Sequence, residues 1–457
     1  MQKCLRLAGR CGCAIHRQNA DYFSVSLVGH ATFMERLLVA WRGFKCTTCG
    51  VAYGRTTDLA LCAQCGGILF ADYALEDLRA DRTADAMRAR SPQLLLRWRE
   101  LMPVTSAASL DRASLGETES PYVEAPSIAR DLNVHSLGLK LDCYLPSGSL
   151  KDRPQSAAIA GAIERGVSIV SISSSGNAGA SLAAHGAKAG IGVVVGLFDG
   201  VPSQKLSKIL AFGPTVVQVF GGMDTAEHVI RSLSARWGWL NCEAFVNPYA
   251  LEGEKTIAFE IAAQCNWEPP DVLFLPLGNA ACVVAPHKGF RELHALGLVR
   301  KVPRLVGVQF EACAPIARAF EERAEDIRPF ARKPSFSSTL MHECPISGRL
   351  ALNAIRESGG AAIAVTDDQV RAAMCALARQ AGIFAEPAGA IALAGAKLWA
   401  DQGKLRPSER IACLVSGSGM NQLDAMPLSG RIIGPLPPEE LINLAADPGR
   451  TLEVRPA

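Results

Sequence analysis

The sequence predicts an α/β protein with open parallel sheets covered by helices. From about residue 168 to residue 310, short runs rich in β-branched residues alternate with segments of helical periodicity, and short loops join them. The most apolar runs, residues 192–198 and 272–277, have the length of buried strands and are far too short to cross a bilayer. In such sheets ligands bind beyond the carboxyl ends of the strands, so the loops at those ends are the first places to search for a site.

The alternation assigns each element in order. It predicts strands at residues 168–173, 193–198, 215–220, 244–247, 271–277 and 304–310, and helices at residues 178–189, 204–212, 226–236 and 252–264. A further apolar run covers residues 411–415. Strands joined through helices form right-handed βαβ units, which give parallel sheets.

Length and charge limit the classes of function. A chain of 457 residues is long enough for two or three domains. Lys plus Arg number 47 and Asp plus Glu number 44, so the charge balance favours neither nucleic acid nor a membrane surface as a partner. Most of the 15 cysteines stand singly inside apolar runs, and the start shows no signal-peptide pattern. We therefore expect a soluble, cytoplasmic protein that binds any anionic ligand locally.

Four cysteines form two CxxC pairs separated by twelve residues: Cys46, Cys49, Cys62 and Cys65. This is a zinc-ribbon spacing, and Gly50, Gly66 and Gly67 follow the pairs where the backbone must turn toward the sulfurs. Four thiolates complete a tetrahedral shell and leave no open position for catalysis, so the predicted zinc is structural. The alternative is two redox-inert or disulfide-bonded pairs.

Lys151 follows a tight Ser-Gly-Ser turn within residues 146–154 and stands at the start of a predicted helix. Amides at a helix N-terminus attract anions and disfavour an ammonium ion, so we expect the charged form of this lysine to be destabilised. These properties suit a Schiff-base lysine that carries a phosphorylated aldehyde. By itself, the segment favours an ordinary turn followed by a solvated first helical turn.

Three more loops carry suitable residues. Residues 173–177 place hydroxyl groups and an amide before a helix, where they can hold a carboxylate or, through Asn177, a phenolic oxygen; an ordinary helix cap is the alternative. Residues 278–282 open a helix, so successive amides can converge on a phosphate. Residues 416–419 (Ser-Gly-Ser-Gly) end an apolar run and alone favour a flexible turn.

Together these segments resemble the threonine synthase branch of the fold-type-II pyridoxal-phosphate enzymes, from about residue 116 to about residue 419. The likeness rests on six segments in the family's order: residues 146–153, 174–177, 247–256, 277–282, 386–388 and 416–419. The cysteine segment is similar to a ribbon found in some members. The resemblance implies the two-domain fold-type-II architecture with open parallel sheets, an N-terminal zinc ribbon, and pyridoxal 5'-phosphate as cofactor.

The resemblance also implies roles for single residues. Lys151 would form the internal aldimine and shuttle protons at Cα and Cβ of an amino-acid substrate. Asn177 would bind the cofactor's 3-hydroxyl, and Ser416 would face its pyridine nitrogen, where a neutral hydroxyl favours elimination and replacement over transamination. The cofactor phosphate would lie on the backbone amides of Gly278, Asn279, Ala280, Ala281 and Cys282. The substrate would be bound by Ser174, Ser175, Gly176 and Ala178.

Several positions depart from threonine synthases. Ala178 stands where a threonine is usual, and Ala250 stands where an arginine usually grips the substrate's phosphate. Ser418 replaces a usual histidine, and Ala281 and Cys282 replace a glycine and an asparagine. The loss of a guanidinium contact removes about 1.5 to 3 kcal/mol.

These departures predict β- or γ-elimination or replacement on an amino acid whose leaving group need not be phosphate. One alternative is a true threonine synthase acting on O-phosphohomoserine, in which Lys205, Lys255 or Arg349 replaces the missing arginine. Another is a catalytically silent binding or regulatory protein that keeps the fold and the ribbon, although a scaffold has no need of intact Lys151, Asn177 and Ser416 together.

The resemblance also suggests an organisation of the chain. We expect an N-terminal extension at residues 1–40, a zinc ribbon at 41–75, a helical connector at 76–115, a catalytic region at 116–430 with a smaller lobe at about 166–245, and a tail at 431–457. Residues 1–33 are either a poorly ordered extension or precede the true start. Family members are commonly dimers, so a homodimer is expected.

Overall fold

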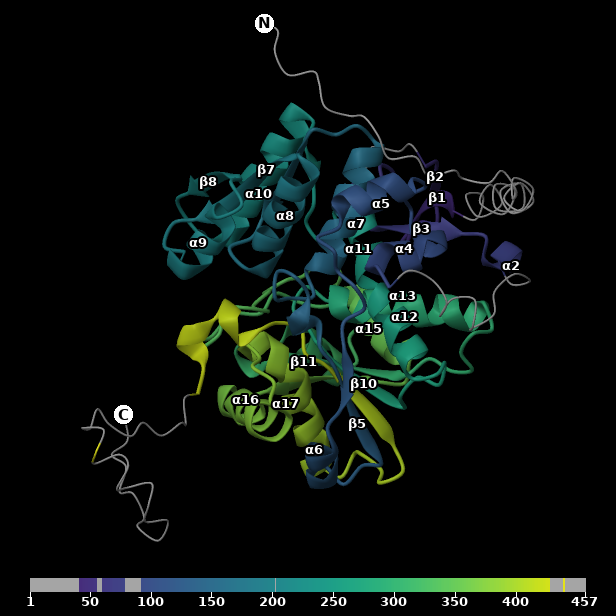
Figure 1. Ribbon diagram of the computed structural model, residues 1–457, viewed down its shortest axis with the longest axis vertical. Coiled ribbons are helices and arrows are strands. Elements are labelled where there is room, and N and C mark those ends of the chain that lie inside the picture. The colour runs from purple at the N-terminus through teal and green to yellow at the C-terminus, as the bar shows by residue number, and fades with distance from the viewer. Residues whose placement is uncertain (1–40, 56–59, 79–91, 202, 428–438, 440–457) are drawn as a thin grey trace, which may run out of the picture.

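Three sheets organise the protein (Figure 1), a computed structural model that describes residues 41–55, 60–78, 92–201, 203–427 and 439. The strand orders are β2-β1-β3, β8-β7-β6-β9 and β12-β11-β10-β13-β5-β4. The two larger sheets lie in separate bodies and are parallel apart from one edge strand. The predicted α/β class with open parallel sheets is therefore confirmed. The predicted N-terminal extension lies outside the described residues, as does the predicted C-terminal tail apart from residue 439.

The small N-terminal sheet contains β1 (Trp41–Cys46), β2 (Ala52–Tyr53) and β3 (Leu69–Tyr73), and β1 pairs antiparallel with both neighbours. A short helix, α2 (Leu75–Leu78), follows it. The segment predicted as a helical connector contains α4 (Leu94–Arg97), the 3-10 turn η2 (Arg99–Leu101) and α5 (Ala107–Ala113); residues 79–91 lie outside the described part.

The four-stranded sheet is built from β6 (Ile169–Ser173), β7 (Gly192–Phe198), β8 (Thr215–Val219) and β9 (Leu240–Asn241), all parallel. Helices α8 (Asn177–Ala189), α9 (Ser203–Leu210) and α10 (Met223–Trp237) accompany it. A Cβ atom at Gly196 would lie 2.2 Å from the side chain of Ile230, so α10 packs on β7 at a position that only glycine allows.

The strand predicted at residues 244–247 was wrong. Ala244 and Asn247 form only an isolated bridge, and the fourth strand, β9, lies earlier in the chain. The reason is that Asn247 caps a helix: its side-chain oxygen accepts hydrogen bonds from the amides of Tyr249 and Ala250. The helix predicted at residues 252–264 is accordingly two helices, α11 (Pro248–Glu254) and α12 (Thr256–Gln264), which meet at Lys255.

The six-stranded sheet holds β4 (Tyr122–Glu124), β5 (Ser136–Lys140), β10 (Val272–Pro276), β11 (Arg304–Phe310), β12 (Ala361–Val365) and β13 (Arg410–Leu414), and β4 is antiparallel to β5. Side chains alternate between two cores along each strand: on β10, Leu273 and Leu275 join one hydrophobic cluster, and Val272 and Phe274 join the other. This alternation explains why the strands read as continuous apolar runs.

Helices cover both faces of this sheet (Figure 1). One cluster includes residues of α12, α13 (Ala281–Ala295), α14 (Pro315–Glu321) and α15 (Gly348–Glu357), and the other includes residues of α6 (Pro126–Asp131), α16 (Asp367–Ala381) and α17 (Pro387–Asp401). Single 3-10 turns follow several strands: η3 (Asp142–Tyr144), η4 (Glu311–Cys313), η5 (Gly419–Asn421) and η6 (Leu423–Ala425).

Helices α7 (Asp152–Glu164) and α11 cross at the centre of the molecule. A Cβ atom at Gly161 would meet the ring of Tyr249 at 2.6 Å, and one at Gly253 would meet the carbonyl oxygen of Arg153 at 2.1 Å. Glycines on both helices thus permit a close crossing, which places the end of α11 beside the start of α7.

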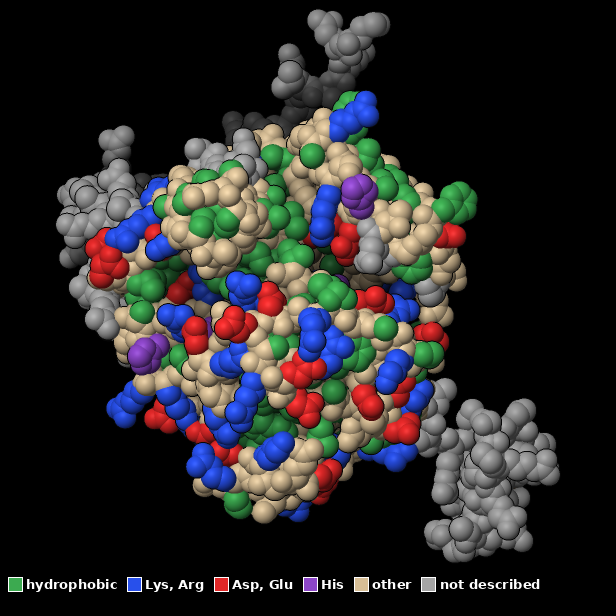
Figure 2. Space-filling model, turned by 180° about the vertical axis from the view of Figure 1, so that it is seen from behind, with side chains coloured by type: hydrophobic (Ala, Val, Ile, Leu, Met, Phe, Trp, Pro, Cys, Tyr) green, Lys and Arg blue, Asp and Glu red, His purple; other side chains and the backbone are tan. Residues whose placement is uncertain are grey.

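The surface carries both signs of charge. In Figure 2, basic and acidic side chains are interspersed over the face of the six-stranded sheet's body. Among the described residues, no helix combines the length and the apolar composition needed to cross a membrane.

Candidate active site and metal site

Lys151 precedes the first turn of α7, behind a loop that is fastened to the end of β13. Gly148 has φ +75°, and its carbonyl oxygen accepts a hydrogen bond of 2.9 Å from the amide of Ser418. The amide of Leu150 donates to the carbonyl oxygen of Ser416 at 2.9 Å. Two predicted loops, residues 146–154 and 416–419, therefore lie side by side, although they are far apart in sequence.

The Lys151 amine has few partners. Its Nζ lies 4.0 Å from Oε1 of Glu254, the side chain is 23% exposed, and within the described residues it makes no hydrogen bond. Burial lowers the pKa of Lys151, but the negative charges of Glu254, Cys282 and Glu386 together outweigh burial, and the net pKa is raised. The expectation of a destabilised ammonium ion was wrong, because a carboxylate on α11 faces the amine that the helix amides were expected to repel.

A buried ion network holds the first turn of α7 behind Lys151. The guanidinium of Arg153 donates two hydrogen bonds to Asp142, at 2.8 and 2.7 Å, and two to Glu260, at 2.6 and 2.8 Å. Lys140 also contacts Glu260, and all four side chains are fully buried. Two bidentate contacts fix the guanidinium in one orientation, so the first turn of α7 is held firmly.

Asp152 holds the loop in front of Lys151. Its Oδ2 accepts a hydrogen bond of 2.7 Å from the amide of Ser147, and its Oδ1 accepts one of 2.7 Å from Ser181 on α8. His185 lies with Nε2 3.5 Å from Oδ1, while its Nδ1 faces the carbonyl oxygen of Ala113 at 2.7 Å. Burial lowers the pKa of His185, but the hydrogen bond to Asp152 and the charges of Glu117 and Asp152 together outweigh burial, and the net pKa is raised.

The loop predicted to bind a carboxylate, residues 173–177, connects β6 to α8. Ser174, Ser175, Gly176, Asn177 and Ala178 are all half-buried, so their polar groups remain within reach of a ligand. The Asn177 side chain donates a hydrogen bond of 2.8 Å from Nδ2 to Oε1 of Glu386, which precedes α17. One amide hydrogen of Asn177 is thereby engaged, and the amide group has a fixed orientation.

The loop predicted to bind a phosphate, residues 278–282, is called the phosphate cup and lies between β10 and α13. Ala280 has φ +73°, and a Cβ atom at Gly278 would lie 2.9 Å from the Leu340 side chain and 3.1 Å from its Cα, so the loop makes a tight turn with little room for a side chain at residue 278. The side-chain oxygen of Asn279 accepts a hydrogen bond of 3.2 Å from the amide of Ala281. Cys282 donates through Sγ to Oε1 of Glu254 at 3.1 Å. The cup is thus adjacent to the carboxylate that faces Lys151.

Ser416 lies at the end of β13 and is buried. Its hydroxyl donates a hydrogen bond of 2.9 Å to the carbonyl oxygen of Ala388 in α17. The Ser416 oxygen can still accept hydrogen bonds, and this side chain carries no charge.

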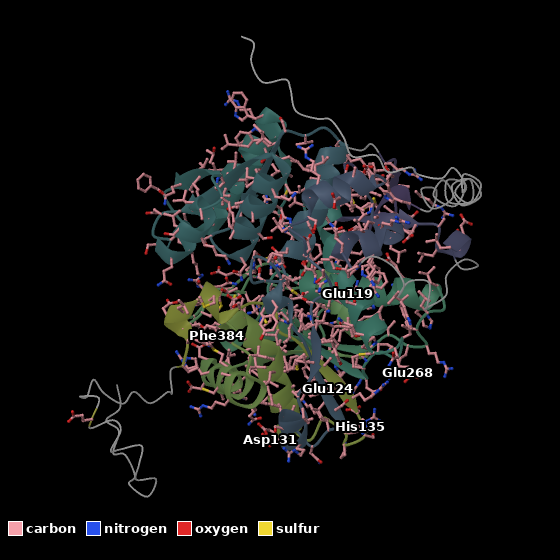
Figure 3. All side chains as sticks on the ribbon, viewed as in Figure 1. Glu119, Glu124, Asp131, His135, Glu268 and Phe384 are labelled. Atoms are coloured by element: carbon pink, nitrogen blue, oxygen red, sulfur yellow. The ribbon has the colours of Figure 1, made fainter. Side chains whose placement is uncertain are left out.

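A cavity of about 210 Å³ adjoins these loops. Ser175, Asn177, Lys205, Lys208, Glu386 and Asn421 are among its lining residues, so it lies between α8 and α9 on one side and the loops of the larger sheet on the other. Phe384, which stands beside this loop region in Figure 3, accepts a hydrogen bond of 2.9 Å at its carbonyl oxygen from the amide of Gly419.

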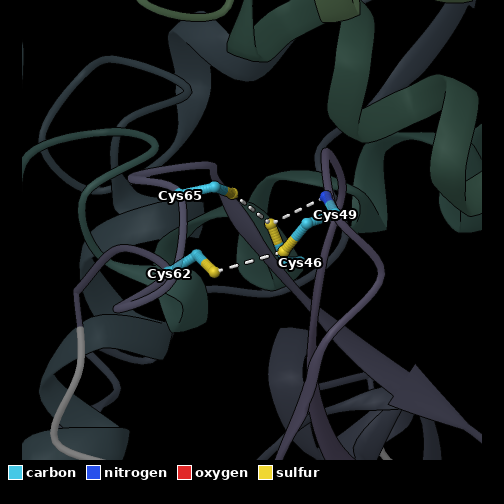
Figure 4. Close-up of side chains that lie close together, drawn as sticks. All are labelled: Cys46, Cys49, Cys62 and Cys65. Atoms are coloured by element: carbon cyan, nitrogen blue, oxygen red, sulfur yellow. Dashed lines mark hydrogen bonds between the residues drawn. The ribbon is translucent and has the colours of Figure 1, made fainter.

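The four cysteines of the small sheet lie together (Figure 4). Their sulfur atoms all lie within 4.8 Å of one another, and the pairs Cys46 with Cys65 and Cys49 with Cys62 are each 3.5 Å apart. A tetrahedral zinc with metal–sulfur distances of about 2.3 Å separates its sulfurs by about 3.8 Å, which lies within the range of separations in this cluster. Gly50 and Gly66 have φ +77° and +69°, as the predicted turns require.

Comparison with known proteins identifies the family. A profile described as "Pyridoxal-phosphate dependent enzyme" matches residues 113–417. The chain belongs to this family. It is 35% identical over 382 residues to a protein of Methanocaldococcus jannaschii named threonine synthase, covering 83% of this chain and 93% of the relative. A threonine synthase of Methanosarcina acetivorans is 34% identical over 374 residues, covering 82% of this chain and 90% of the relative.

Solved structures show the same fold. Maize serine racemase has a TM-score of 0.58 at 18% identity, covering 68% of this chain and 94% of that one. Diaminopropionate ammonia lyase of Escherichia coli has a TM-score of 0.61 at 14% identity, covering 73% and 92%. The predicted resemblance to threonine synthase-like, fold-type-II pyridoxal-phosphate enzymes is thus confirmed.

The site residues fit the cofactor of this pyridoxal-phosphate family. Lys151 presents an amine without a hydrogen bond in the described structure. The loop at residues 278–282 leads into the N-terminus of α13, and Ser416 offers an uncharged hydroxyl. A phosphate on the cup would compete with the Asn279 side chain for the amide of Ala281. Asn279 is only half-buried, so its side chain has room to yield.

Several residues of the site had no predicted role. Glu386 belongs to the segment 386–388 that carries the family resemblance, but no role was predicted for it; burial raises the pKa of its carboxyl group to about 7. Glu254, Lys208 and Asn421 were also missed. A useful signal was the position of Glu386 immediately before the proline that begins α17, since ligands often bind at helix N-termini.

The three basic residues expected to replace the missing arginine lie in different environments. Lys205 lines the cavity and donates a hydrogen bond of 3.0 Å to Ser338. Lys255 is fully buried and paired with Glu252 at 2.5 Å, and Arg349 is 62% exposed and paired with Asp326 at 3.2 Å. Of the three, Lys205 alone has the position that the alternative needs.

Proposed function

We propose that this protein binds pyridoxal phosphate through Lys151 and converts O-phosphohomoserine to threonine. The main support is the position of the Lys151 amine. On one side it lies near the phosphate cup, and on the other side Asn177 and Glu386 separate it from a cavity lined by two lysines. Two relatives at 34 and 35% identity over most of their length are named threonine synthase, which supports this choice over the other reactions of the family.

In the net reaction, the bond between Cγ and the phosphate oxygen breaks and inorganic phosphate leaves. Cβ loses one hydrogen as a proton and gains the hydroxyl of water, Cγ gains a proton, and the other proton leaves with the phosphate. The bound cofactor supplies an electron sink that makes hydrogens at Cα and Cβ acidic. Lys151 is placed to move those protons, since its amine is partly exposed and Glu254 supports its charged form.

The remaining residues orient and enclose the substrate. Ser174, Ser175 and Gly176 present hydroxyl and amide donors suited to the substrate carboxylate. Asn177, oriented by Glu386, keeps a second amide hydrogen for the cofactor's phenolic oxygen. Ser416 would face the cofactor's pyridine nitrogen with an uncharged hydroxyl, which suits elimination and replacement.

A second candidate is elimination or replacement on an amino acid whose leaving group is not phosphate. The observation in its favour is that Ala178 and Ala250 offer no donor where the family has threonine and arginine; Ala250 is buried, at 1% exposure. Both candidate reactions require Lys151. A loss of activity in Lys151→Ala therefore distinguishes both of them from a catalytically silent protein.

The test uses purified, cofactor-loaded protein with O-phosphohomoserine, with phosphate release and threonine formation measured together. We expect both products from the wild type, neither from Lys151→Ala, and both from the surface control Lys404→Ala, whose lysine is exposed. Borohydride reduction followed by peptide mass spectrometry should place the cofactor label on residue 151. Absence of threonine, with ketoacid or another product from different amino acids, would overturn the first candidate in favour of the second.

We also propose that Cys46, Cys49, Cys62 and Cys65 hold one structural zinc ion. Their mutual distances support this, as does the hydrogen bond of 3.0 Å between the Tyr53 hydroxyl and the sulfur of Cys62, which lowers the pKa of that thiol to about 6. Metal analysis of the purified protein should find about one zinc per chain.

A further inference from the structure

Two lysines of α9 bring positive charge to the cavity beside the active site. Lys205 and Lys208 both line it, together with Glu386 and Asn421. Lys205 donates to Ser338 at 3.0 Å, and Lys208 donates to the carbonyl oxygen of Ser147 at 2.6 Å and to Oδ1 of Asn421. All these acceptors are uncharged.

The charge on Lys208 is poorly compensated. In the described parts of the chain, neither α9 lysine has a carboxylate oxygen within ion-pair distance, and burial lowers the pKa of Lys208. A partly buried ammonium ion whose hydrogen-bond partners are all neutral oxygens recovers only part of the free energy lost on desolvation. An anion that binds beside it would recover more of that free energy. The cavity's own acid, Glu386, has a pKa of about 7, so near neutral pH much of it is uncharged and opposes an anion weakly.

We propose that Lys208, with Lys205, forms the subsite that binds the anionic group at the distal end of the amino-acid substrate. This inference rests on the proposed function and assigns its leaving-group site. Position 250 on α11 carries a buried alanine, so a grip from that helix is absent, whereas α9 reaches the cavity from the smaller sheet. The subsite therefore lies on a different element from the arginine usual in the family.

Lys208 also connects this subsite to Lys151. Its ammonium group holds the carbonyl oxygen of Ser147, four residues before Lys151, and the side chain of Asn421, whose Nδ2 donates to the carbonyl oxygen of Gly148 at 2.9 Å. An anion that engages Lys208 therefore acts on the loop that positions the amine. Lys208 thus selects substrates that carry an anionic leaving group. It also couples the binding of that group to the loop that positions Lys151.

The experiment measures binding of inorganic phosphate to the full-length, cofactor-loaded protein, in which the cofactor's own phosphate fills the cup. Calorimetric titration of the wild type should show phosphate binding that weakens with ionic strength. Lys208→Met and Lys205→Met should each raise the phosphate dissociation constant about tenfold or more, because each removes a charge-assisted contact. Lys208→Arg should keep most of the affinity, and Lys404→Met, the same charge change on an exposed lysine, should leave it unchanged.

A second readout covers the case in which Lys208→Met folds poorly. Lys205→Met leaves the Ser147 and Asn421 contacts in place, so it tests the subsite alone. With O-phosphohomoserine, Lys205→Met should raise KM at nearly unchanged kcat, whereas Lys208→Met should also lower kcat, and the cofactor's absorbance should stay unchanged in both.

The outcomes separate this inference from the proposed function. Unchanged phosphate affinity in both methionine variants overturns the subsite, whether or not threonine is formed. Lysine-dependent phosphate binding without threonine formation overturns the proposed function and leaves the subsite standing.

Discussion

Glu252 on α11 is the residue whose replacement should weaken the protein most clearly. Its Oε1 accepts a hydrogen bond of 3.3 Å from the amide of Ala71 in the small N-terminal sheet, and the Tyr73 hydroxyl lies 3.2 Å from its Oε2. The same Oε2 is 2.5 Å from the ammonium group of Lys255 and 3.0 Å from that of Lys288. One buried carboxylate thus joins the cysteine-bearing sheet to the catalytic region.

The magnitude follows from these distances. At an effective dielectric constant of about 20, each of the two ion pairs gains about 5 to 7 kcal/mol of Coulomb energy, most of which offsets desolvation. Glu252→Gln keeps the shape of the side chain but leaves Lys255 and Lys288 with Glu292 as the one nearby carboxylate of the described cluster. Removing one partner of a buried pair costs about 3 to 5 kcal/mol, so the free energy of unfolding should fall by that amount.

The assay is urea unfolding followed by tryptophan fluorescence at pH 7. The matched control is Glu76→Gln, which breaks an exposed pair with Arg42 whose side chains are 53% and 64% accessible, and it should change stability by less than about 1 kcal/mol. A loss below about 1 kcal/mol in Glu252→Gln as well would refute the reasoning. The double variant with Lys288→Met should recover part of the loss, since it removes one uncompensated charge.

Three further predictions concern single sites. The raised pKa of His185 contributes stability that is present below its unfolded value of about 6.5 and lost as pH rises through the folded pKa, so His185→Gln should remove this pH dependence from thermal melts. Glu386, with its pKa raised to about 7, binds a proton more tightly when folded, so the cofactor-free protein should lose stability between about pH 4.5 and 7; Glu386→Gln should lose less across that range. Cys46→Ser should release the bound zinc, measured with a metallochromic dye, and lower the melting temperature, whereas Cys375→Ser, on α16 away from the cluster, should do neither.

The sequence alone determined the features that depend on near neighbours in the chain. Strands such as Arg304–Phe310 follow from local runs of apolar residues, because alternate side chains of a parallel strand are buried on both faces. The two CxxC pairs and the turn before Lys151 follow from spacing, because glycine and cysteine have restricted uses at such positions. Local signals failed at residues 244–247, where a helix cap prevented a strand.

Only the tertiary structure decided which of these pieces meet. Asn177 and Glu386 are 209 residues apart and share a hydrogen bond because packing brings the start of α8 beside the start of α17. No local pattern distinguishes Lys205, which lines the cavity, from Lys255, which is buried against Glu252. The pKa values of Lys151 and Glu386 likewise depend on burial and on charges brought near by other elements, and these depend on packing rather than on sequence spacing.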